Sequence, residues 1–140
     1  MDDCIGTPLH QAAENGQNAI CQLLMKYTKD QNIKNRFGMT PFHLASRRGH
    51  FEVCQTLGVN HIKDLNGDTP LHLAVKEGNI NICKMILKEV SEINPRNLAG
   101  LSTLHLSAKF GHMDIYKLLI EKNINKEQKT GLGLSQLQFS

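Results

Sequence analysis

Thr69-Pro70-Leu71-His72-Leu73-Ala74 is a stretch whose first four residues recur, with small changes, at three other places in the chain. The other copies are Thr7-Pro8-Leu9-His10, Thr40-Pro41-Phe42-His43 and Ser102-Thr103-Leu104-His105. The first residues of successive copies lie 33, 29 and 33 positions apart. A glycine follows nine residues after each of these first residues, at Gly16, Gly49, Gly78 and Gly111. Two independent markers therefore show the same repeat, which is typical of a fold built from stacked copies of one small unit.

Each copy carries the residues that start a helix. Thr or Ser at the first position can cap a helix through its hydroxyl group, and proline after it is tolerated because the first turn has unpaired N–H groups anyway. The glycine that follows can adopt the left-handed conformation that ends a short helix. Apolar residues at helical spacing then predict a second helix in each copy, at residues 20–24, 53–57, 82–86 and 115–119. Each repeat is therefore predicted to be a helix pair that buries its apolar side chains against its neighbours.

Polar, turn-prone segments lie between the pairs, at residues 35–38, 64–67 and 97–100. Each ends in a glycine, which suits a tight hairpin turn. The whole pattern resembles the ankyrin-repeat family, with its period of 33 residues and its Thr-Pro-Leu-His signature. The resemblance implies an all-α solenoid of stacked helix pairs with short β-hairpin fingers. We expect a single ankyrin-repeat domain over residues 1–140, with repeats at approximately 2–34, 35–63, 64–96 and 97–129 and a partial repeat at 130–140.

Two departures from the regular pattern stand out. The interval of 29 residues places a four-residue deletion between Leu57 and Asp64, where a Thr and a Gly also replace expected apolar residues. A weakened second helix is predicted in that repeat. Residues 133–140 match residues 100–107 at an interval of 33, so a fifth repeat begins and is cut off. The chain is then either a short array with a small cap or a fragment of a longer protein.

Composition narrows the class of protein. The 140 residues are 40% hydrophobic and 21% charged, with no Trp, and the formal net charge is +3. These values exclude a disordered tail, and no apolar stretch reaches the length of a membrane span. The acidic start Met1-Asp2-Asp3-Cys4 has no secretory signal, and no Asn-x-Ser/Thr glycosylation acceptor occurs. We therefore expect an intracellular protein, in the cytoplasm or the nucleus, with no membrane partner.

One histidine recurs in each repeat, at His10, His43, His72 and His105. Histidine can bind metals or act as an acid or a base. A residue that occurs once per unit is spread along a solenoid, so these four should form local hydrogen bonds and not converge on one site. The sequence also contains no phosphate-binding loop and no zinc-protease, hydrolase or dinucleotide-binding motif. We expect no enzymatic activity, no metal and no cofactor.

Three cysteines share one position of the second helix: Cys21, Cys54 and Cys83. A free cysteine behaves as a small hydrophobe at such a position, so we expect core packing and not redox sensing. Cys4 lies near the chain end and should be the most reactive thiol. The four cysteines form no Cys-x-x-Cys pair, which argues against a zinc site.

The family's concave binding face, which the fingers and the first helices form, maps onto a basic and apolar set of residues. The basic residues on it are Lys34, Arg36, Arg47, Arg48, Lys63, Lys76, Arg96 and Lys109. The acidic residues at the finger and first-helix positions of the same repeats are Asp64, Asp68 and Glu77. Apolar residues at positions usually turned to solvent are Phe37, Met39, Leu65, Leu98, Leu101 and Phe110. This mixture suits a protein interface. The alternative is that the basic excess carries no meaning, because Lys is common before the fingers of this family.

These observations predict a monomeric binding module that holds an acidic or mixed-charge segment of another protein on its concave face, as an adaptor or an inhibitor. An alternative is a targeting or structural part of a larger signalling protein, channel or effector, which the truncated fifth repeat favours. Nucleic-acid binding is disfavoured, because the net charge is modest and no aromatic residues are interleaved with a basic run.

Overall fold

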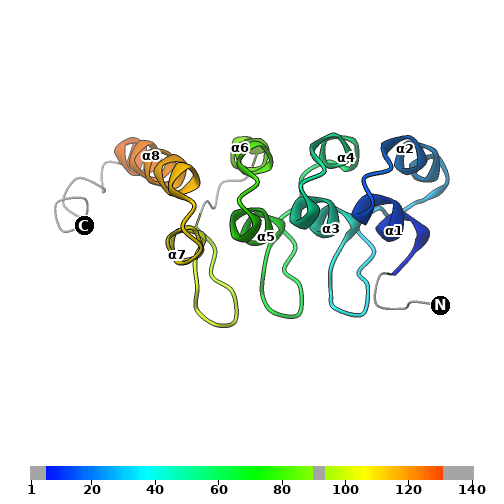
Figure 1. Cartoon of the computed structure of the whole chain (residues 1–140), viewed down its shortest axis with the longest axis horizontal. Helices are drawn as coiled ribbons and strands as arrows, with labels where there is room; N and C mark the ends of the chain where they lie inside the picture. The colour runs from blue at the N-terminus through cyan, green and yellow to red at the C-terminus, as the bar shows by residue number, and fades with distance from the viewer. Residues whose placement is uncertain (1–5, 90–93, 131–140) are drawn as a thin grey trace.

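The computed structural model describes residues 6–89 and 94–130, with side chains up to Lys122. Eight α-helices lie in this part of the chain, and consecutive helices form pairs. The first helices of the pairs are α1 (Pro8–Glu14), α3 (Pro41–Arg48), α5 (Pro70–Glu77) and α7 (Thr103–Lys109). The second helices are α2 (Asn18–Tyr27), α4 (Phe51–Leu57), α6 (Ile80–Glu89) and α8 (Met113–Thr130). The pairs stand side by side in one elongated row (Figure 1), so the predicted all-α solenoid is confirmed.

All four first helices start with the same capping arrangement. The hydroxyl group of the capping residue accepts the N–H of a histidine three residues later, and Nδ1 of that histidine accepts the N–H of the capping residue. The capping residues are Thr7, Thr40, Thr69 and Ser102. In α3 the two distances are 3.3 Å and 3.0 Å. The reciprocal pair satisfies N–H groups that a helix start leaves without partners, so the repeated signature starts a helix as predicted.

The same histidines join each repeat to the next. Because Nδ1 accepts a hydrogen bond, the neutral ring carries its proton on Nε2. In three of the four histidines, Nε2 then donates to the carbonyl just before the next capping residue. These bonds join His10 to Met39 at 2.9 Å, His43 to Asp68 at 3.2 Å and His72 to Leu101 at 3.3 Å. The capping bonds confirm the local hydrogen bonds predicted for all four histidines, and these three bonds add a contact to the next repeat.

Burial lowers the pKa of His10, His43 and His72 below the usual 6.5, because a charged ring would lose its hydration. The hydrogen bonds to their carbonyl acceptors raise the pKa of these histidines, but less than burial lowers it. The unfolded chain therefore binds protons at pH values where the folded chain does not. The stability that depends on the neutral rings is complete above pH 6.5 and is lost as the pH falls below it.

We therefore expect the free energy of unfolding, measured by urea denaturation, to fall when the pH is lowered from about 7.5 to about 5.5. A His43→Gln variant cannot titrate at this position. It should start from a lower stability at the higher pH and should lose less of it over the same interval. Equal losses in the two proteins would show that His43 makes no contribution to the pH effect.

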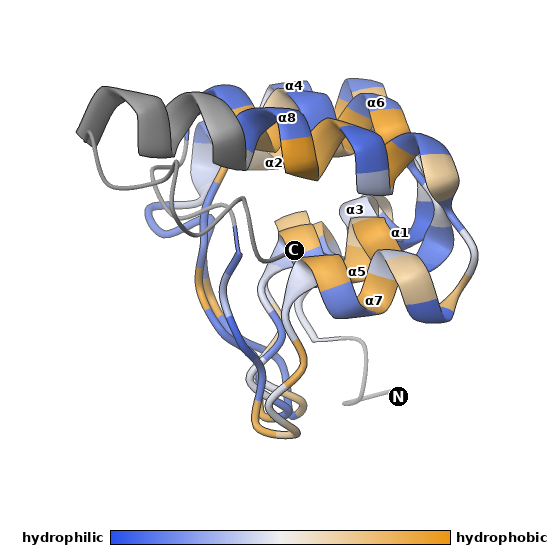
Figure 2. Cartoon of the chain, turned by 90° about the vertical axis from the view of Figure 1, so that its left-hand side faces the viewer, coloured by the Kyte–Doolittle hydropathy of each residue, from blue (hydrophilic) through white to orange (hydrophobic). Residues whose placement is uncertain are grey.

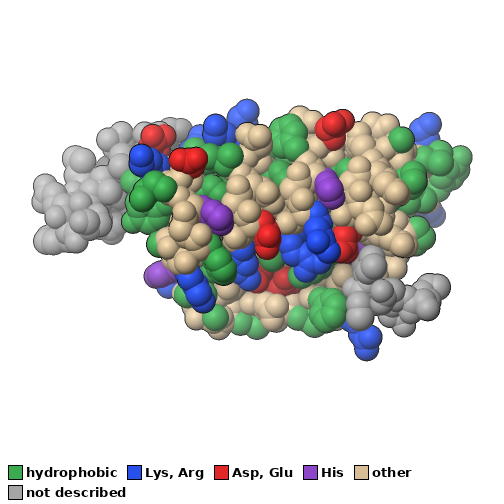
Figure 3. Space-filling model, viewed as in Figure 1, with side chains coloured by type: hydrophobic (Ala, Val, Ile, Leu, Met, Phe, Trp, Pro, Cys, Tyr) green, Lys and Arg blue, Asp and Glu red, His purple; other side chains and the backbone are tan. Residues whose placement is uncertain are grey.

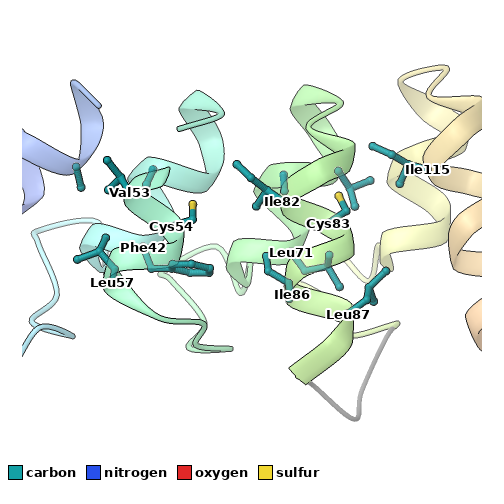
Figure 4. Close-up of a cluster of buried hydrophobic side chains, with 14 of the residues drawn as sticks. Phe42, Val53, Cys54, Leu57, Leu71, Ile82, Cys83, Ile86, Leu87 and Ile115 are labelled. Carbon is teal, nitrogen blue, oxygen red and sulfur yellow. The ribbon is translucent and has the colours of Figure 1, made fainter. Parts of the chain in front are cut away.

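A shared apolar core runs between the two rows of helices. Its largest cluster draws on all four pairs, and members from several of them are at most 2% exposed: Phe42, Leu57, Ile82, Ile86 and Ile115. Ile82 extends toward the preceding pair, and Ile115 extends toward α6 (Figure 4). Each repeat thus completes the core of its neighbour, so stability depends on the interfaces between repeats.

The helix cysteines Cys21, Cys54 and Cys83 are 0% exposed within this core, as predicted. Burial raises the pKa of Cys54 and of Cys83 to about 12, because the thiolate would be desolvated. These thiols stay protonated at neutral pH and act as packing residues. Tyr116 occupies the corresponding position in the last pair and is 38% exposed. Cys4 lies outside the described residues, so its expected reactivity stays a prediction.

The four-residue deletion coincides with a short second helix. α4 ends at Leu57 after 7 residues, whereas α2 and α6 have 10 residues each. α8 departs in the opposite direction and runs for 18 residues to Thr130. Its sequence from Glu121 to Thr130 contains no Gly or Pro, so nothing local ends the helix earlier. The partial repeat predicted at 130–140 lies, from residue 131 on, outside the described residues.

The segments between the pairs form tight turns, which we call the fingers. The side-chain oxygen of the first finger residue accepts two backbone N–H groups, from the residues two and four positions later. The first residues are Asn35, Asp64 and Asn97. An antiparallel bridge joins Arg96 and Ser102, and the described residues contain no longer ladder. The N–H of each first residue also donates to the carbonyl four positions later, at 2.8 to 3.0 Å. The fingers are therefore tight turns held by backbone and side-chain bonds, with less strand than the hairpins that the resemblance implies.

Candidate protein-binding surface

The fingers and the row of first helices lie at an angle to each other, with the second helices beyond the first (Figure 2). We call the surface inside this angle the concave face. Its residues come from the finger segments 34–39, 63–68 and 96–101 and from the last turns of the first helices. Three fingers and four helix ends thus contribute side chains to one surface.

Large apolar side chains are exposed at the fingertips. Phe37 is 49% exposed, Leu65 is 66% exposed and Leu98 is 79% exposed. The N–H of Leu65 donates to the Phe37 carbonyl at 3.0 Å, and the N–H of Leu98 donates to the Asn66 carbonyl at 2.9 Å. These bonds hold neighbouring fingertips together, and Figure 2 shows apolar residues at their ends. A row of exposed apolar side chains is typical of a surface that another protein covers.

Two apolar residues predicted for this face are placed differently. Met39 is 8% exposed and belongs to a second small cluster with Leu44 and Leu73, so the prediction that it faces solvent is wrong. Leu101 is partly buried against the main core. Met39 and Leu101 are buried for the same reason. The carbonyl of each accepts a hydrogen bond from a histidine of the preceding repeat, and this bond holds the backbone close to the helices. Phe110 is 47% exposed, as predicted.

Three of the predicted basic residues already have carboxylate partners. Arg48 Nη2 lies 2.8 Å from Glu14 Oε2, and Arg47 Nη2 lies 3.9 Å from the same oxygen. Lys76 Nζ lies 2.9 Å from Asp68 Oδ2. Basic and acidic side chains accordingly lie beside one another over the first helices (Figure 3). The concave face is therefore less positive than its sequence composition indicates.

Asp68 is the centre of a buried polar network that was not predicted. Its side chain is 2% exposed, and besides the ion pair with Lys76 it accepts Asn97 Nδ2 on Oδ1 at 2.9 Å. Residues from two repeats thus compensate the buried carboxylate. A signal was present in the sequence, because the corresponding residues of the neighbouring repeats, Met39 and Leu101, are apolar. A polar residue at an otherwise apolar repeat position indicates a buried partner.

The other predicted basic residues lie on the fingers and at the end of α7. The exposed ones are Lys34, Arg36, Lys63, Arg96 and Lys109. Lys63 Nζ donates to the Arg96 carbonyl at 3.2 Å, and Arg96 Nη1 donates to the Gly100 carbonyl at 3.0 Å. Lys109 Nζ lies 5.9 Å from the centre of the Phe110 ring and pairs with no carboxylate among the described side chains.

A pocket of about 480 Å³ lies where the last two fingers meet α5 and α7. The residues around it that matter for recognition are Asp68, Lys76, Leu98, Leu101, Lys109 and Phe110. All of them except Asp68 were predicted from the sequence as partner-binding residues. The structure brings them together from two successive repeats, whereas Lys34, Arg36 and Phe37 line no part of this pocket.

Two further histidines support the stacking. His50 Nε2 lies 2.9 Å from the Glu14 carbonyl, and His112 Nε2 lies 3.0 Å from the Lys76 carbonyl. Each ring thus satisfies a carbonyl at the end of the preceding first helix. Within the described side chains, no three His, Cys, Asp or Glu residues are grouped as metal ligands. Among the described helices, none is long and apolar enough to cross a membrane.

Similarity to known proteins agrees with this architecture. The family model described as ankyrin repeats (three copies) matches residues 2–61 and 57–130. The espin-like protein of Homo sapiens is 44% identical over 52 residues, which are 37% of this chain and 5% of that protein. The E3 ubiquitin-protein ligase XBAT33 of Arabidopsis thaliana is 45% identical over 53 residues, 38% of this chain and 10% of that protein. Protein phosphatase 1 regulatory subunit 12A of Mus musculus is 40% identical over 60 residues, which are 43% of this chain and 6% of that protein.

The chain spans at most a tenth of the length of each of these three relatives. They differ widely in the activities that their names state, so the similarity lies in the repeat and not in one shared activity. The family match covers nearly the whole chain, and the capping motif and the stacked helix pairs agree with it. The chain therefore belongs to the ankyrin-repeat family.

Proposed function

We propose that this chain binds a segment of another protein along its concave face and acts, as a monomer, as an adaptor or an inhibitor by occupying that segment. Ankyrin repeats are protein–protein interaction modules and generally have no enzymatic activity. The observation that carries the proposal is the row of exposed apolar fingertips, Phe37, Leu65 and Leu98, beside basic side chains. Apolar side chains surrounded by charged ones are the usual composition of a protein interface.

The bound segment is expected to be acidic or of mixed charge. Lys34, Lys63, Arg96 and Lys109 are exposed and form no ion pair with a described carboxylate. Unpaired cations on a surface attract acidic partners and speed association, and salt weakens this attraction. The paired arginines of α3 contribute less to the attraction, because Glu14 offsets part of their charge.

Photo-crosslinking tests where the partner binds. Benzoylphenylalanine is introduced into the whole chain in cells, at Phe37 or Leu98 on the fingers, or at Gln55 or Lys84 as controls. The two controls are exposed residues of second helices, away from the concave face. We expect protein crosslinks from the finger positions and none from the helix positions. The reverse pattern would contradict the proposal, and crosslinks to nucleic acid alone would replace it with another function.

Once the partner is identified by its crosslink, substitutions separate apolar anchoring from charge attraction. Phe37→Ala and Phe110→Ala should each weaken binding at least about tenfold at every salt concentration, because burial of an apolar anchor depends little on ionic strength. Lys63→Glu should instead slow association, most strongly at low salt. Biolayer interferometry gives both rate constants, with Lys84→Glu as the control. Normal binding by all three concave-face variants would refute the proposed location.

A further inference from the structure

We propose that the pocket between the last two fingers and helices α5 and α7 receives an apolar side chain that stands next to a carboxylate in the partner segment. This inference rests on the proposed function and specifies the partner's chemistry at one place on the concave face. The pocket volume of about 480 Å³ is large enough for one apolar side chain together with a neighbouring acidic group.

The apolar part of the recognition comes from two facing elements. Leu98, on the last finger, is 79% exposed, and Phe110, at the end of α7, is 47% exposed. Leu101 lies between them in the sequence and is partly buried against the core, so it lines the pocket without being free to move away. An apolar side chain inserted here removes the surfaces of Leu98 and Phe110 from water at the same time.

The carboxylate already present in the pocket does not attract a basic partner. Asp68 is 2% exposed, and its two oxygens are taken by Lys76 at 2.9 Å and by Asn97 at 2.9 Å. Adding a second cation would require breaking one of these buried contacts, which is costly. The Asp68–Lys76 pair is therefore a neutral part of the pocket wall.

Lys109 supplies the charge that selects an acid. It lies 33 residues after Lys76, at the same position of the next repeat, and Leu101 stands where Asp68 stands in the repeat before. The last described repeat thus keeps the lysine but has an apolar residue in place of its carboxylate partner. Lys109 lies over the Phe110 ring at 5.9 Å, at the rim of the pocket. A partner carboxylate beside Lys109 takes the role that Asp68 has beside Lys76.

Small probes test this chemistry without knowledge of the partner. The probes are 4-phenylbutyrate, its neutral amide and 4-phenylbutylamine, which share one apolar group and differ in charge. Binding to the whole chain is followed by amide chemical shifts in NMR titrations. We expect 4-phenylbutyrate to shift the amides of residues 97–101 and 106–110 and to bind about threefold to fivefold more tightly than the amide, as for one exposed ion pair. The amine should bind more weakly than both.

Two variants separate the apolar and ionic parts. Lys109→Gln should abolish the preference for the carboxylate and leave binding of the amide unchanged. Leu98→Ala should weaken all three probes by a similar factor, about threefold. Both side chains are exposed, so the amide spectrum should otherwise stay that of the folded chain. Lys84→Gln, an exposed lysine of α6, is the control and should change nothing.

Equal affinities for the three probes, or a carboxylate preference that survives Lys109→Gln, would overturn the inference. So would shifts spread over the second helices. The photo-crosslinking experiment distinguishes a failure of the pocket inference from a failure of the proposed function. Finger crosslinks to a protein together with no probe binding reject the pocket chemistry alone, whereas probe binding together with crosslinks from Gln55 and Lys84 rejects the concave-face function alone.

Discussion

His43→Ala is expected to lower the free energy of unfolding by about 3 kcal/mol. The ring of His43 accepts the Thr40 N–H at 3.0 Å and lies 3.2 Å from the Asp68 carbonyl of the next repeat. Thr40 and His43 are 0% exposed, so removal of the ring leaves buried polar groups without partners and opens a cavity between two repeats. Urea denaturation at neutral pH measures the loss.

His105→Ala is the matched control, because the chain repeats the same capping arrangement there. His105 accepts the Ser102 N–H at 3.1 Å, but it is exposed, and no bond of its Nε2 is found among the described residues. Its replacement should therefore cost about 1 kcal/mol, the cost of a weakened helix cap. Similar losses in the two variants would mean that the bond between repeats contributes little and that the cap accounts for the whole effect.

Gly67→Ala is expected to lower the free energy of unfolding by about 3 kcal/mol, because it causes both backbone strain and a steric clash. Gly67 has φ 77°, which an alanine adopts only with strain. A Cβ placed there would lie 2.6 Å from the backbone N of Leu98, closer than real contacts allow. Because that N–H donates to the Asn66 carbonyl, the two fingers must separate and lose this bond. Hydrogen exchange at the Leu98 amide should become faster, and urea denaturation gives the total.

Gly100→Ala measures the contribution of backbone strain without the steric clash that Gly67→Ala also causes. Gly100 has nearly the same φ, 80°, but a Cβ there meets nothing within 4 Å among the described residues. Its replacement should cost only the strain, about 1 kcal/mol. If Gly67→Ala and Gly100→Ala are equally stable, the fingers are not held in register by the bond between Asn66 and Leu98.

Much of the fold follows from local chemistry, which is why the sequence predicts it. A hydroxyl followed by proline and, two residues later, histidine starts a helix at each place where this chain repeats it, as at Thr40 and Thr69. The deletion before Asp64 is visible as a shorter interval and appears as the short helix α4. The extension of α8 to Thr130 was not predicted. Aligning the repeats places the end of this helix where the earlier second helices end, although the residues that follow here have no helix breaker among them.

The concave face could be predicted in outline but not in its charges. Positions transfer from repeat to repeat, so Phe37, Leu65 and Leu98 were placed correctly at exposed fingertips. Ion pairs depend on distances between side chains of different repeats. The contact of Arg48 with Glu14, 34 residues earlier, has no counterpart in the repeat pattern. Met39 was misplaced for a similar reason, since its burial depends on a bond to His10 of the preceding repeat.

The sequence by itself thus determined the family, the helix pairs, their capping and the positions of the fingers, because each depends on residues within one repeat. The tertiary structure alone decided which charges remain unpaired and where a pocket opens. Arg48 pairs at 2.8 Å with Glu14 of the preceding repeat, whereas Lys63 pairs with no described carboxylate although Asp64 follows it in the sequence. That difference arises because electrostatic energy depends on distance in space and on burial, neither of which is set by the order of residues along one repeat.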